Sequence, residues 1–499
     1  MTRAFRWLAA VAATVVMISP PVWVVALTAT VATAIILART SAYLRRRREA
    51  QRDPPSGTVA LGRDAGGARV VLTDQQLSAH ALILGATGAG KSTTLLAVLA
   101  EHVRCGRPVV AIDMKGSPAF ARSLADAAAS VGRPFRVWTP DGSGRWNPLA
   151  HGNPTELKDK LIASERFTEP HYQRAAERYV QTVLQVLEHV HPRDPPTLED
   201  VVNLMDPRRV SGLLRHAPRQ LAERVQDYLA TLSSDQLSAI RGLGTRLALI
   251  TESQAGPYLA PAAGQEAIDL RDGLTRGHVV LFSLNSARYG GLASQLGTLV
   301  IQDLVAATGH RLLDPGREGP ATVGIDEFSA LRSDNVISLL ARCRESGVSV
   351  LLATQELADL DRAAPGLRDQ VLGSTAVKII HRQDVPRSAQ TIAQMAGTET
   401  VWEQTRHTAA HPVFGDHDSG RGTRRQAERF LVHPNAISSL PPGEAVLITK
   451  VPRAAVRTVR VAPTRAARER PRAPAAPTPQ RLPTSARPTG AERRGPELG

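Results

Sequence analysis

The sequence has very little cysteine, and this scarcity excludes several classes of protein. Cys105 and Cys343 are the only cysteines among 499 residues. Two cysteines cannot form a disulfide framework, and their spacing matches no zinc signature. With 42% apolar and 21% charged residues, the composition is that of a folded protein. We therefore expect about three folding units, at roughly 150 residues each, in a reducing compartment.

A strongly basic body is also missing, although the formal net charge is +15. Residues 1–50 hold seven arginines and one glutamate, a sum of +6. Residues 453–499 hold eleven arginines and three glutamates, a sum of +8, so the 402 residues in between sum to only +1. This distribution excludes a uniformly basic DNA coat. Net charge alone therefore does not identify a nucleic-acid partner.

Charged residues are absent between Arg6 and Arg39, and this stretch holds two apolar runs. The runs, residues 7–18 and 22–38, are separated by Ser-Pro-Pro at residues 19–21. Three interpretations compete: a cleaved signal peptide, a single membrane span, or a helical hairpin that turns at the prolines.

Arginines on both sides of this apolar block favour the hairpin. Arg3 and Arg6 precede the block, and residues 45–48 are four arginines that follow it. The positive-inside rule assigns both flanks to the cytoplasm, which requires an even number of crossings. We therefore predict a transmembrane helical hairpin and basic flank over residues 1–48, in the plasma membrane, with the remainder of the chain in the cytoplasm.

The sequence pattern of the remaining residues predicts an α/β protein with a helical insertion. After a polar linker at residues 49–56, short β-branched runs alternate with helical stretches, which is typical of a parallel sheet. The expected strands are residues 81–84, 108–112, 135–138, 278–283, 322–325, 348–353, 376–380 and 445–448.

The domain boundaries follow from changes in this pattern. Residues 151–275 have helical spacing, with 14 basic and 17 acidic residues, and form an all-α insertion. The α/β domain is therefore expected in two parts, residues 57–150 and 276–452. Residues 453–499 are rich in arginine and proline, and we expect them to form a disordered tail.

The clearest chemical motif is G-x-x-x-x-G-K-[ST] at residues 85–92, between an expected strand and an expected helix. Its glycines allow backbone N–H groups and the helix N-terminus to surround a phosphate. Lys91 is expected to bind the β- and γ-phosphates of ATP, and the Ser92 hydroxyl to bind Mg²⁺. The alternative is a glycine turn before an ordinary helix. The predicted nucleotide-binding residues are Gly85, Thr87, Gly88, Ala89, Gly90, Lys91, Ser92 and Thr93.

Two acids end the expected strand at residues 322–325. Asp326 is predicted to belong to the Mg²⁺ shell together with Ser92, and Glu327 to act as the general base. Gln355 follows the next strand, where a polar side chain can reach the γ-phosphate and report its loss. The alternative for Gln355 is a glutamine that faces solvent.

Three further positions near the expected strand ends have less specific signals. Arg344, and less strongly Arg342, precede the strand at residues 348–353, where an arginine can act in trans on a neighbouring subunit's nucleotide. The alternative is a cation that a helix C-terminus favours. Asp113 and Lys115 follow the strand at residues 108–112, at an edge where ligands bind, and their role stays open.

With these motifs in place, the chain resembles the type IV secretion coupling proteins of bacterial conjugation, the TraG/TraD type. These proteins belong to the same P-loop ATPase superfamily as the FtsK and HerA translocases. The resemblance covers most of residues 56–452. It rests on residues 85–92, 113–116, 146–149, 325–328, 347–355, 432–434 and 440–444.

The resemblance implies a RecA-like ATPase domain with an inserted all-α domain and an amino-terminal membrane anchor. It implies a homo-hexameric ring that uses ATP and Mg²⁺ to move DNA from a relaxase complex toward components of a secretion channel. Asp326, Glu327 and Gln355 match the family's metal, base and sensor residues, and Arg344 its trans-acting arginine. Two departures are the missing extracytoplasmic domain and Met114, where proline is usual.

Two other functions stay open at this point. One is an FtsK-like translocase for double-stranded DNA, although the Pro/Arg-rich tail stands where such chains carry a winged-helix DNA reader. The other is a membrane-tethered ATPase that moves proteins without nucleic acid. The nearly neutral central region does not decide between them, because a DNA-tracking pore needs only a few local cations per subunit.

Overall fold

The computed structural model describes Thr33, Leu37 and residues 57–142, 144–165, 167, 169–314, 319–331, 333–411 and 415–462. Apart from Thr33 and Leu37, the predicted membrane hairpin and the linker that follows it lie outside this part, as do residues 463–499. No helix within the described ranges combines the length and the apolar character that crossing a membrane requires.

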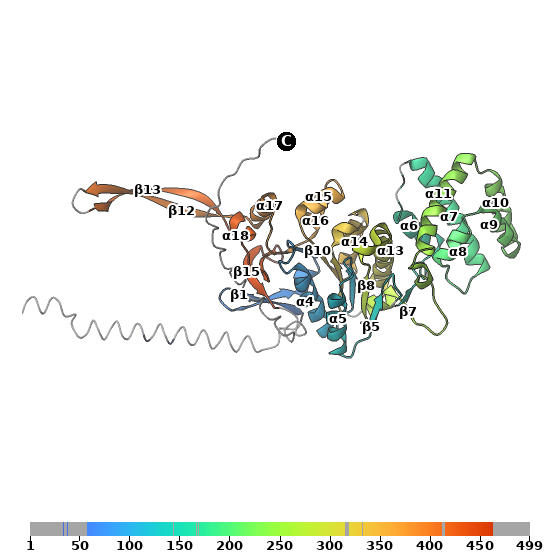
Figure 1. Cartoon of the computed structure of the whole chain (residues 1–499), viewed down its shortest axis with the longest axis horizontal. Coiled ribbons are helices and arrows are strands. Elements are labelled where there is room, and N and C mark those ends of the chain that lie inside the picture. The colour runs from blue at the N-terminus through green and yellow to red at the C-terminus, as the bar shows by residue number, and fades with distance from the viewer. Residues whose placement is uncertain are drawn as a thin grey trace, which may run out of the picture.

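An eleven-stranded mixed sheet forms the centre of the molecule (Figure 1). Its strand order is β2-β1-β15-β14-β11-β3-β10-β9-β4-β8-β5. Strands from β11 to β5 pair in parallel, and β14, β15, β1 and β2 extend the sheet in antiparallel fashion. The parallel strands are β3 (Ala81–Leu84), β4 (Val109–Asp113), β5 (Phe135–Trp138), β8 (Val279–Ser283), β9 (Ala321–Asp326), β10 (Val348–Thr354) and β11 (Val377–Ile380). The antiparallel strands are β1 (Thr58–Asp64), β2 (Arg69–Thr73), β14 (Glu444–Thr449) and β15 (Ala455–Val461). All eight strands expected from the sequence are present.

Helices cover both faces of the parallel part of the sheet. This explains why its central strands are continuous apolar runs and not alternating ones. One face packs on α4 (Lys91–Arg104) and α5 (Pro118–Ala129), and Gly324 of β9 leaves room for α4, since a Cβ there would lie 2.8 Å from Leu99 Cδ1. The other face packs on α12 (Leu270–Thr275), α13 (Ser286–Leu313) and α14 (Ser333–Glu345).

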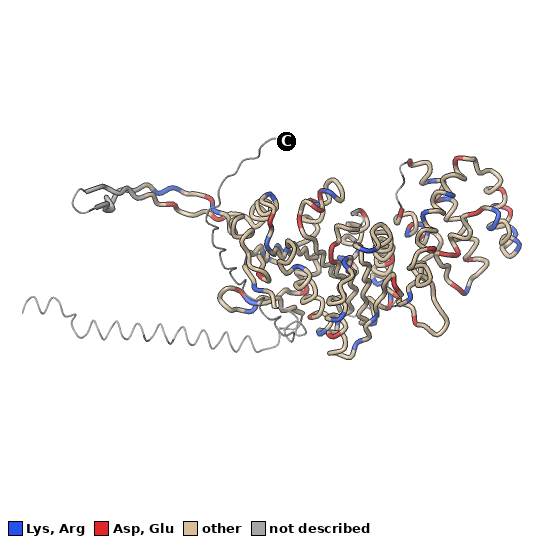
Figure 2. The backbone as a smooth tube through the Cα atoms, viewed as in Figure 1, with Lys and Arg blue, Asp and Glu red and all other residues tan. Residues whose placement is uncertain are grey.

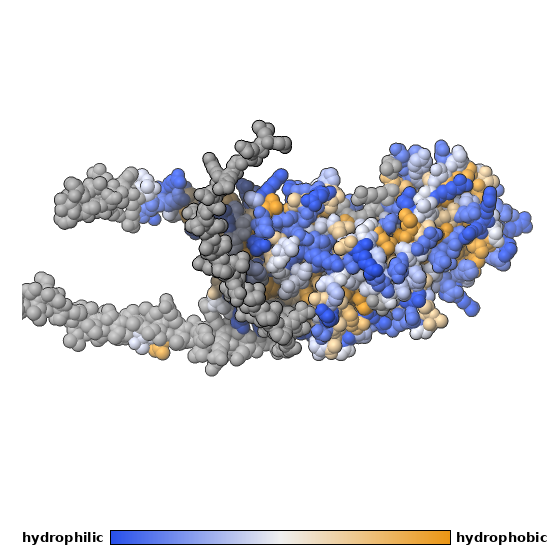
Figure 3. Space-filling view, viewed as in Figure 1, coloured by the Kyte–Doolittle hydropathy of each residue, from blue (hydrophilic) through white to orange (hydrophobic). Residues whose placement is uncertain are grey.

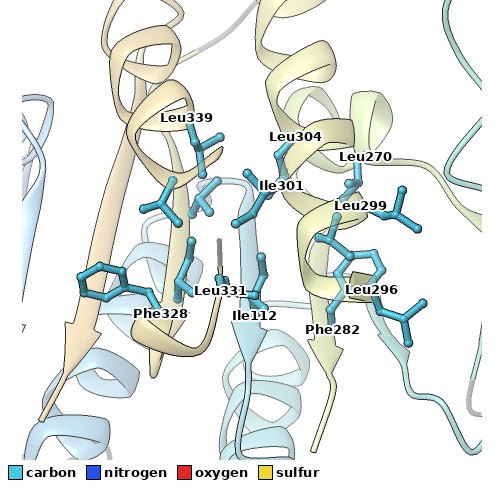
Figure 4. Packing of buried hydrophobic residues seen from close by; sticks show 14 of the residues in the cluster. Ile112, Leu270, Phe282, Leu296, Leu299, Ile301, Leu304, Phe328, Leu331 and Leu339 are labelled. Atoms are coloured by element: carbon cyan, nitrogen blue, oxygen red, sulfur yellow. The ribbon is translucent and has the colours of Figure 1, made fainter. Parts of the chain in front are cut away.

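The interior of this second face is closely packed. Leu296, Ile301 and Leu304 of α13 lie over Ile112 of β4 and Phe282 of β8 (Figure 4). Each of these side chains is fully buried. The core therefore fixes the positions of the strand ends that carry the polar residues described below.

A block of helices lies beside the sheet, at the end where β5 is the last strand (Figure 1). It comprises α6 (Pro154–Ala163), α7 (Pro170–Val190), α8 (Leu198–Asn203), α9 (Pro207–Leu213), α10 (Arg219–Ala230) and α11 (Ser234–Thr251). The short strands β6 (Arg145–Trp146) and β7 (Ala267–Ile268) pair at its base. A buried ion pair ties the block to α13, because Lys160 Nζ lies 2.8 Å from Asp303 Oδ1. Trp146 Nε1 donates to the other oxygen of Asp303 at 3.0 Å.

The predicted start of the disordered tail at residue 453 is wrong. β15 pairs with both β14 and β1, so the sheet continues to Val461. Val459 and Val461 are buried while Arg460 between them is exposed, which is the alternation of a strand end with one covered face. The abundance of arginine in this stretch concealed that short alternation.

A long β-hairpin that the sequence did not lead us to expect projects from the body (Figure 1). It consists of β12 (Thr398–His411) and β13 (Gly415–Phe430) and lies between α17 (Pro386–Ala396) and α18 (Pro434–Ser438). The remaining helices of four or more residues in the described ranges are α3 (Asp74–Leu77), α15 (Leu357–Ala363) and α16 (Leu367–Ser374). The hairpin sheet contains only its own two strands.

Candidate nucleotide-binding site

The glycine-rich loop connects β3 to α4, as its motif predicts. Gly88 and Gly90 adopt left-handed backbone conformations, with φ of 77° and 114°, which only glycine adopts without strain. The helix begins at Lys91, so Ser92 and the exposed Thr93 lie in its first turn, where backbone N–H groups have no partner within the helix. The loop therefore has the backbone geometry of an anion-binding site.

Three neighbouring segments hold the loop in place. The Gly85 N–H donates to the Thr354 carbonyl at the end of β10 (3.3 Å), and the Ala86 N–H to the Arg382 carbonyl after β11 (2.9 Å). The buried Ala89 accepts at its carbonyl from the Gly443 N–H at 2.9 Å, just before β14. The Pro-Pro-Gly segment at residues 441–443 is thus a support of the loop.

The acids at the end of β9 meet the lysine of the loop. Lys91 Nζ lies 2.7 Å from Asp326 Oδ1 and 3.1 Å from Glu327 Oε2, and the Ser92 hydroxyl donates to Asp326 Oδ2 at 2.6 Å. Burial raises the pKa of Asp326, but the charges of Lys91 and Lys115 outweigh it, so this pKa lies below its ordinary value. Asp326 is therefore ionised at neutral pH.

Glu327 is held in an unusual conformation at the centre of the site. Its φ of 59° and ψ of 46° are left-handed, which is uncommon for a residue with a Cβ and concentrates at functional sites. Its Oε2 accepts hydrogen bonds from Lys91 Nζ (3.1 Å) and Gln355 Nε2 (3.3 Å). A carboxylate held in this way beside a phosphate loop is placed to orient and deprotonate a water molecule.

Gln355 links the base to the loop. Its Oε1 accepts from the Thr87 hydroxyl at 3.0 Å while its amide nitrogen donates to Glu327. Gln355 is half-buried at this contact and does not simply face solvent. A group that moved between Thr87 and Glu327 would break these bonds, which is the geometry that a sensor of the γ-phosphate needs.

Arg344 and Arg342 are not part of this site within one chain. Both are exposed near the end of α14, where burial and, to a smaller extent, the charge of Arg344 lower the pKa of His80. The end of α14 lies near the amino-terminal ends of the parallel strands. The seven residues of β10 separate it from Gln355 by about 20 Å. A role for Arg344 in trans stays a prediction.

Lys115, whose role the sequence left open, joins the site directly. Its Nζ lies 3.1 Å from Glu327 Oε2 and 3.7 Å from Asp326 Oδ2. Asp113 shapes the turn that presents it, because its fully buried carboxyl accepts from the Lys115 N–H (2.9 Å) and the Ser117 N–H (2.6 Å). Burial raises the pKa of Asp113.

His381 also belongs to the site, although no motif in the sequence indicates it. It is fully buried beneath the loop, and its ring nitrogens contact the Thr94 hydroxyl and the Glu444 carbonyl, both at 2.8 Å. Burial lowers its pKa to about 4, so the ring is neutral at pH 7. A Cβ at Gly85 would lie 2.9 Å from His381 Cβ, so this histidine also explains the glycine.

The residues present fit a Mg²⁺–nucleotide complex. Ser92 Oγ and Asp326 Oδ2 are the expected protein ligands, and they already lie within 2.6 Å of each other. Mg²⁺ in phosphate-transfer sites takes one or two protein ligands, its other ligands being phosphate oxygens and water. The described part of the chain has no cluster of three or more histidine, cysteine or acidic side chains that could hold a metal ion.

Two protein families match separate parts of the chain. Residues 320–442 match the family described as the TraM recognition site of TraD and TraG, and residues 42–105 match the FtsK/SpoIIIE family. A comparison with curated protein sequences gives no match.

Several solved structures are similar to the chain. The bacterial conjugative coupling protein TrwB, in a trigonal form with sulphate, matches at a TM-score of 0.61 and 15% identity, covering 84% of this chain and 91% of that one. TrwB in complex with ADP and Mg²⁺ matches at 0.58 and 15% identity, with the same coverage. VirB4 of Thermoanaerobacter pseudethanolicus matches at 0.52 and 14% identity, covering 83% of this chain and 98% of that one.

Fold and site together define an α/β nucleotide-binding protein of the P-loop class. Within that class, the chain has the fold of a conjugative coupling protein along most of its length. The resemblance to the TraG/TraD coupling proteins that the motifs indicate is confirmed by the family match over residues 320–442 and by the similarity to TrwB.

Proposed function

We propose that the chain is a membrane-anchored ATPase that moves DNA as a conjugative type IV coupling protein. In this role it receives a relaxase–DNA complex and drives the DNA toward a secretion channel, as a homo-hexameric ring in the plasma membrane. The observation that carries the proposal is the constellation of Lys91, Asp326, Glu327 and Gln355 at one sheet edge. It occurs in a chain whose carboxyl-terminal part matches a coupling-protein family.

The site supplies each function that ATP hydrolysis requires. The loop and Lys91 bind the phosphates, and Ser92 with Asp326 holds Mg²⁺, which neutralises charge on the phosphates when it is bound. Glu327 orients the attacking water and accepts its proton. Lys91 leaves its contact with Glu327 for the phosphates on ATP binding, which frees the base. The TrwB complex with ADP and Mg²⁺ has the same fold and supports this cofactor pair.

Membrane anchoring and ring formation rest on arguments outside the site. The arginines on both sides of the apolar block support a two-helix anchor in residues 1–48. Arg344 is exposed near the amino-terminal ends of the parallel strands, whereas the nucleotide site of the same chain lies at their carboxyl ends. This position suits contact with the nucleotide of a neighbouring subunit.

An FtsK-like translocase of double-stranded DNA is the second candidate. The match of residues 42–105 to the FtsK/SpoIIIE family favours it, because this segment includes the glycine-rich loop. Both candidates are ATP-driven DNA motors, so the nucleotide site serves either one.

The proposal is tested by the variant Lys91→Ala in a conjugation assay with membrane fractionation. We expect loss of ATPase activity and DNA transfer with normal insertion in the membrane, because Lys91 contacts the phosphates and not the anchor. The control Arg219→Ala removes a side chain that is 91% exposed on α10 and should transfer DNA normally. DNA transfer by the Lys91 variant at the unaltered level would refute the motor function.

A further inference from the structure

The β12–β13 hairpin extends far from the body, and none of its side chains described at residues 398–405 and 423–430 is buried. Fourteen residues of β12 correspond to about 45 Å of strand, and within the described chain the two strands pair only with each other (Figure 1). Two-stranded hairpins with both faces in water are at best marginally stable. A partner that covers part of this hairpin would therefore stabilise it.

The hairpin exposes an aromatic side chain among polar ones. Trp402 is 59% exposed near the base, and the guanidinium of Arg424 lies 5.6 Å from its ring centre. Val401 and Ala427 are opposite each other on the other face and are only partly covered. The described part of the hairpin face that is visible in Figure 3 is mostly hydrophilic. Burial of an exposed tryptophan is a common source of binding energy at protein interfaces.

Charges of opposite sign are divided between the two strands (Figure 2). Residues 398–405 of β12 carry Glu399 and Glu403, and each lies directly across from an arginine of β13. Arg425 Nη2 is 2.8 Å from Glu403, and Arg429 Nη2 is 2.7 Å from Glu399. These residues share one face, so that face has an acidic strand beside a basic strand.

The balance of charge argues against nucleic acid or an anionic membrane as the partner. Residues 398–405 carry two acids, and residues 423–430 carry three arginines and one glutamate, so the two segments cancel. Binding to phosphate-rich surfaces needs an excess of positive charge. A surface with equal and separated charges instead complements a second copy of itself.

We propose that the hairpins of neighbouring copies pack side by side, with β12 of one copy beside β13 of the next. In a ring of copies whose hairpins point the same way, these two strands run antiparallel to each other, so their free backbone edges can pair. Each basic strand then lies between two acidic strands, and each hairpin edge is covered. This contact deepens the proposed function, because it rests on the ring that the function requires.

Two charge variants of the full chain in detergent test the contact. The acidic hairpin carries Arg425→Glu and Arg429→Glu, and the basic hairpin carries Glu399→Arg and Glu403→Arg. Either variant alone brings like charges together, and we expect the concentration needed for assembly, measured by chemical cross-linking, to rise at least about tenfold. The chain with all four exchanges restores alternation and should assemble normally.

An equimolar mixture of the two charge variants separates contacts between copies from contacts within one hairpin. The ion pairs inside every hairpin stay broken in the mixture, so recovered assembly arises only from an acidic hairpin beside a basic one. Unaltered assembly of both single variants, or no recovery in the mixture, would overturn the proposal.

A direct contact is tested in a Cys105→Ser background, since Cys105 is exposed. Differently tagged chains carrying Thr400→Cys or Gln426→Cys should cross-link to each other through a short bismaleimide. No mixed product between the two tags would also overturn the proposal. ATP binding, measured with a fluorescent nucleotide, should be normal in every variant. Its loss in the parent chain would instead contradict the proposed function, so the two failures are distinguishable.

Discussion

Three buried neutral histidines predict that the α/β domain loses stability steeply in mild acid. His80, His102 and His381 are at most 2% exposed, and burial lowers their pKa values from 6.5 to about 4, 3 and 4. A hydrogen bond agrees with a neutral His80 ring, because the Val350 N–H donates to its Nδ1, which must therefore be unprotonated. Unfolding exposes each ring to water and returns its pKa to the ordinary value.

The size and sign of the effect follow from these pKa values. A base whose pKa is lowered by folding contributes stability that is complete above pH 6.5 and is lost as the pH falls toward 4. At pH 5 each histidine then costs about 2 kcal/mol relative to pH 7.5, and three independent sites cost about 6 kcal/mol. That sum is comparable to the entire stability of many domains.

Urea unfolding of the protein between pH 7.5 and pH 5 measures this loss. The variant His381→Gln removes one titrating ring, so its loss over the same interval should be smaller by about 2 kcal/mol. The comparison of slopes is independent of any constant cost of the substitution. A stability that is the same at pH 7.5 and pH 5, or an unaltered slope in the variant, would refute the reasoning.

Two further predictions concern hydrolysis. Lys115→Ala should lower kcat by about 10- to 100-fold with little effect on ATP binding, since a charge-assisted hydrogen bond to Glu327 contributes roughly 1.5–3 kcal/mol. Lys115→Arg should retain part of the activity. An unaltered kcat of Lys115→Ala in a steady-state ATPase assay would exclude this role. Chains with Arg344→Ala and chains with Glu327→Gln should each be inactive alone but recover some ATPase activity when mixed, and no recovery despite proven co-assembly would argue against action in trans.

The parallel part of the fold could be predicted because its strands are buried on both faces. Residues 81–84 of β3 and 350–353 of β10 are continuous apolar runs, and such runs are visible in a single sequence. Of the antiparallel strands, only the apolar β14 could be found in this way. β15 buries only Val459 and Val461, and no side chain described in the β12–β13 hairpin, at residues 398–405 and 423–430, is buried. Neither element therefore leaves a strong hydrophobic pattern.

Part of the nucleotide site could likewise be predicted from the sequence and part could not. Lys91, Ser92 and Asp326 belong to motifs with fixed spacing, and the parallel sheet brings their strand ends together. The contact of Lys115 with Glu327 depends on a turn that the Asp113 carboxyl shapes, which spacing does not reveal. The contact of residues 441–443 with the loop could not be predicted without the strand order of the sheet, because these residues are more than 300 positions from the loop.

The proposed DNA motor can be tested by the ATPase activity of the purified chain without DNA, with single-stranded DNA and with double-stranded DNA. We expect DNA to stimulate hydrolysis and the stimulation to fall steeply with added salt, because Lys and Arg contacts to phosphates release counterions. A preference for double-stranded DNA would favour the FtsK-like alternative. Activity that is the same with and without DNA at every salt concentration would contradict the central claim and indicate a motor for proteins.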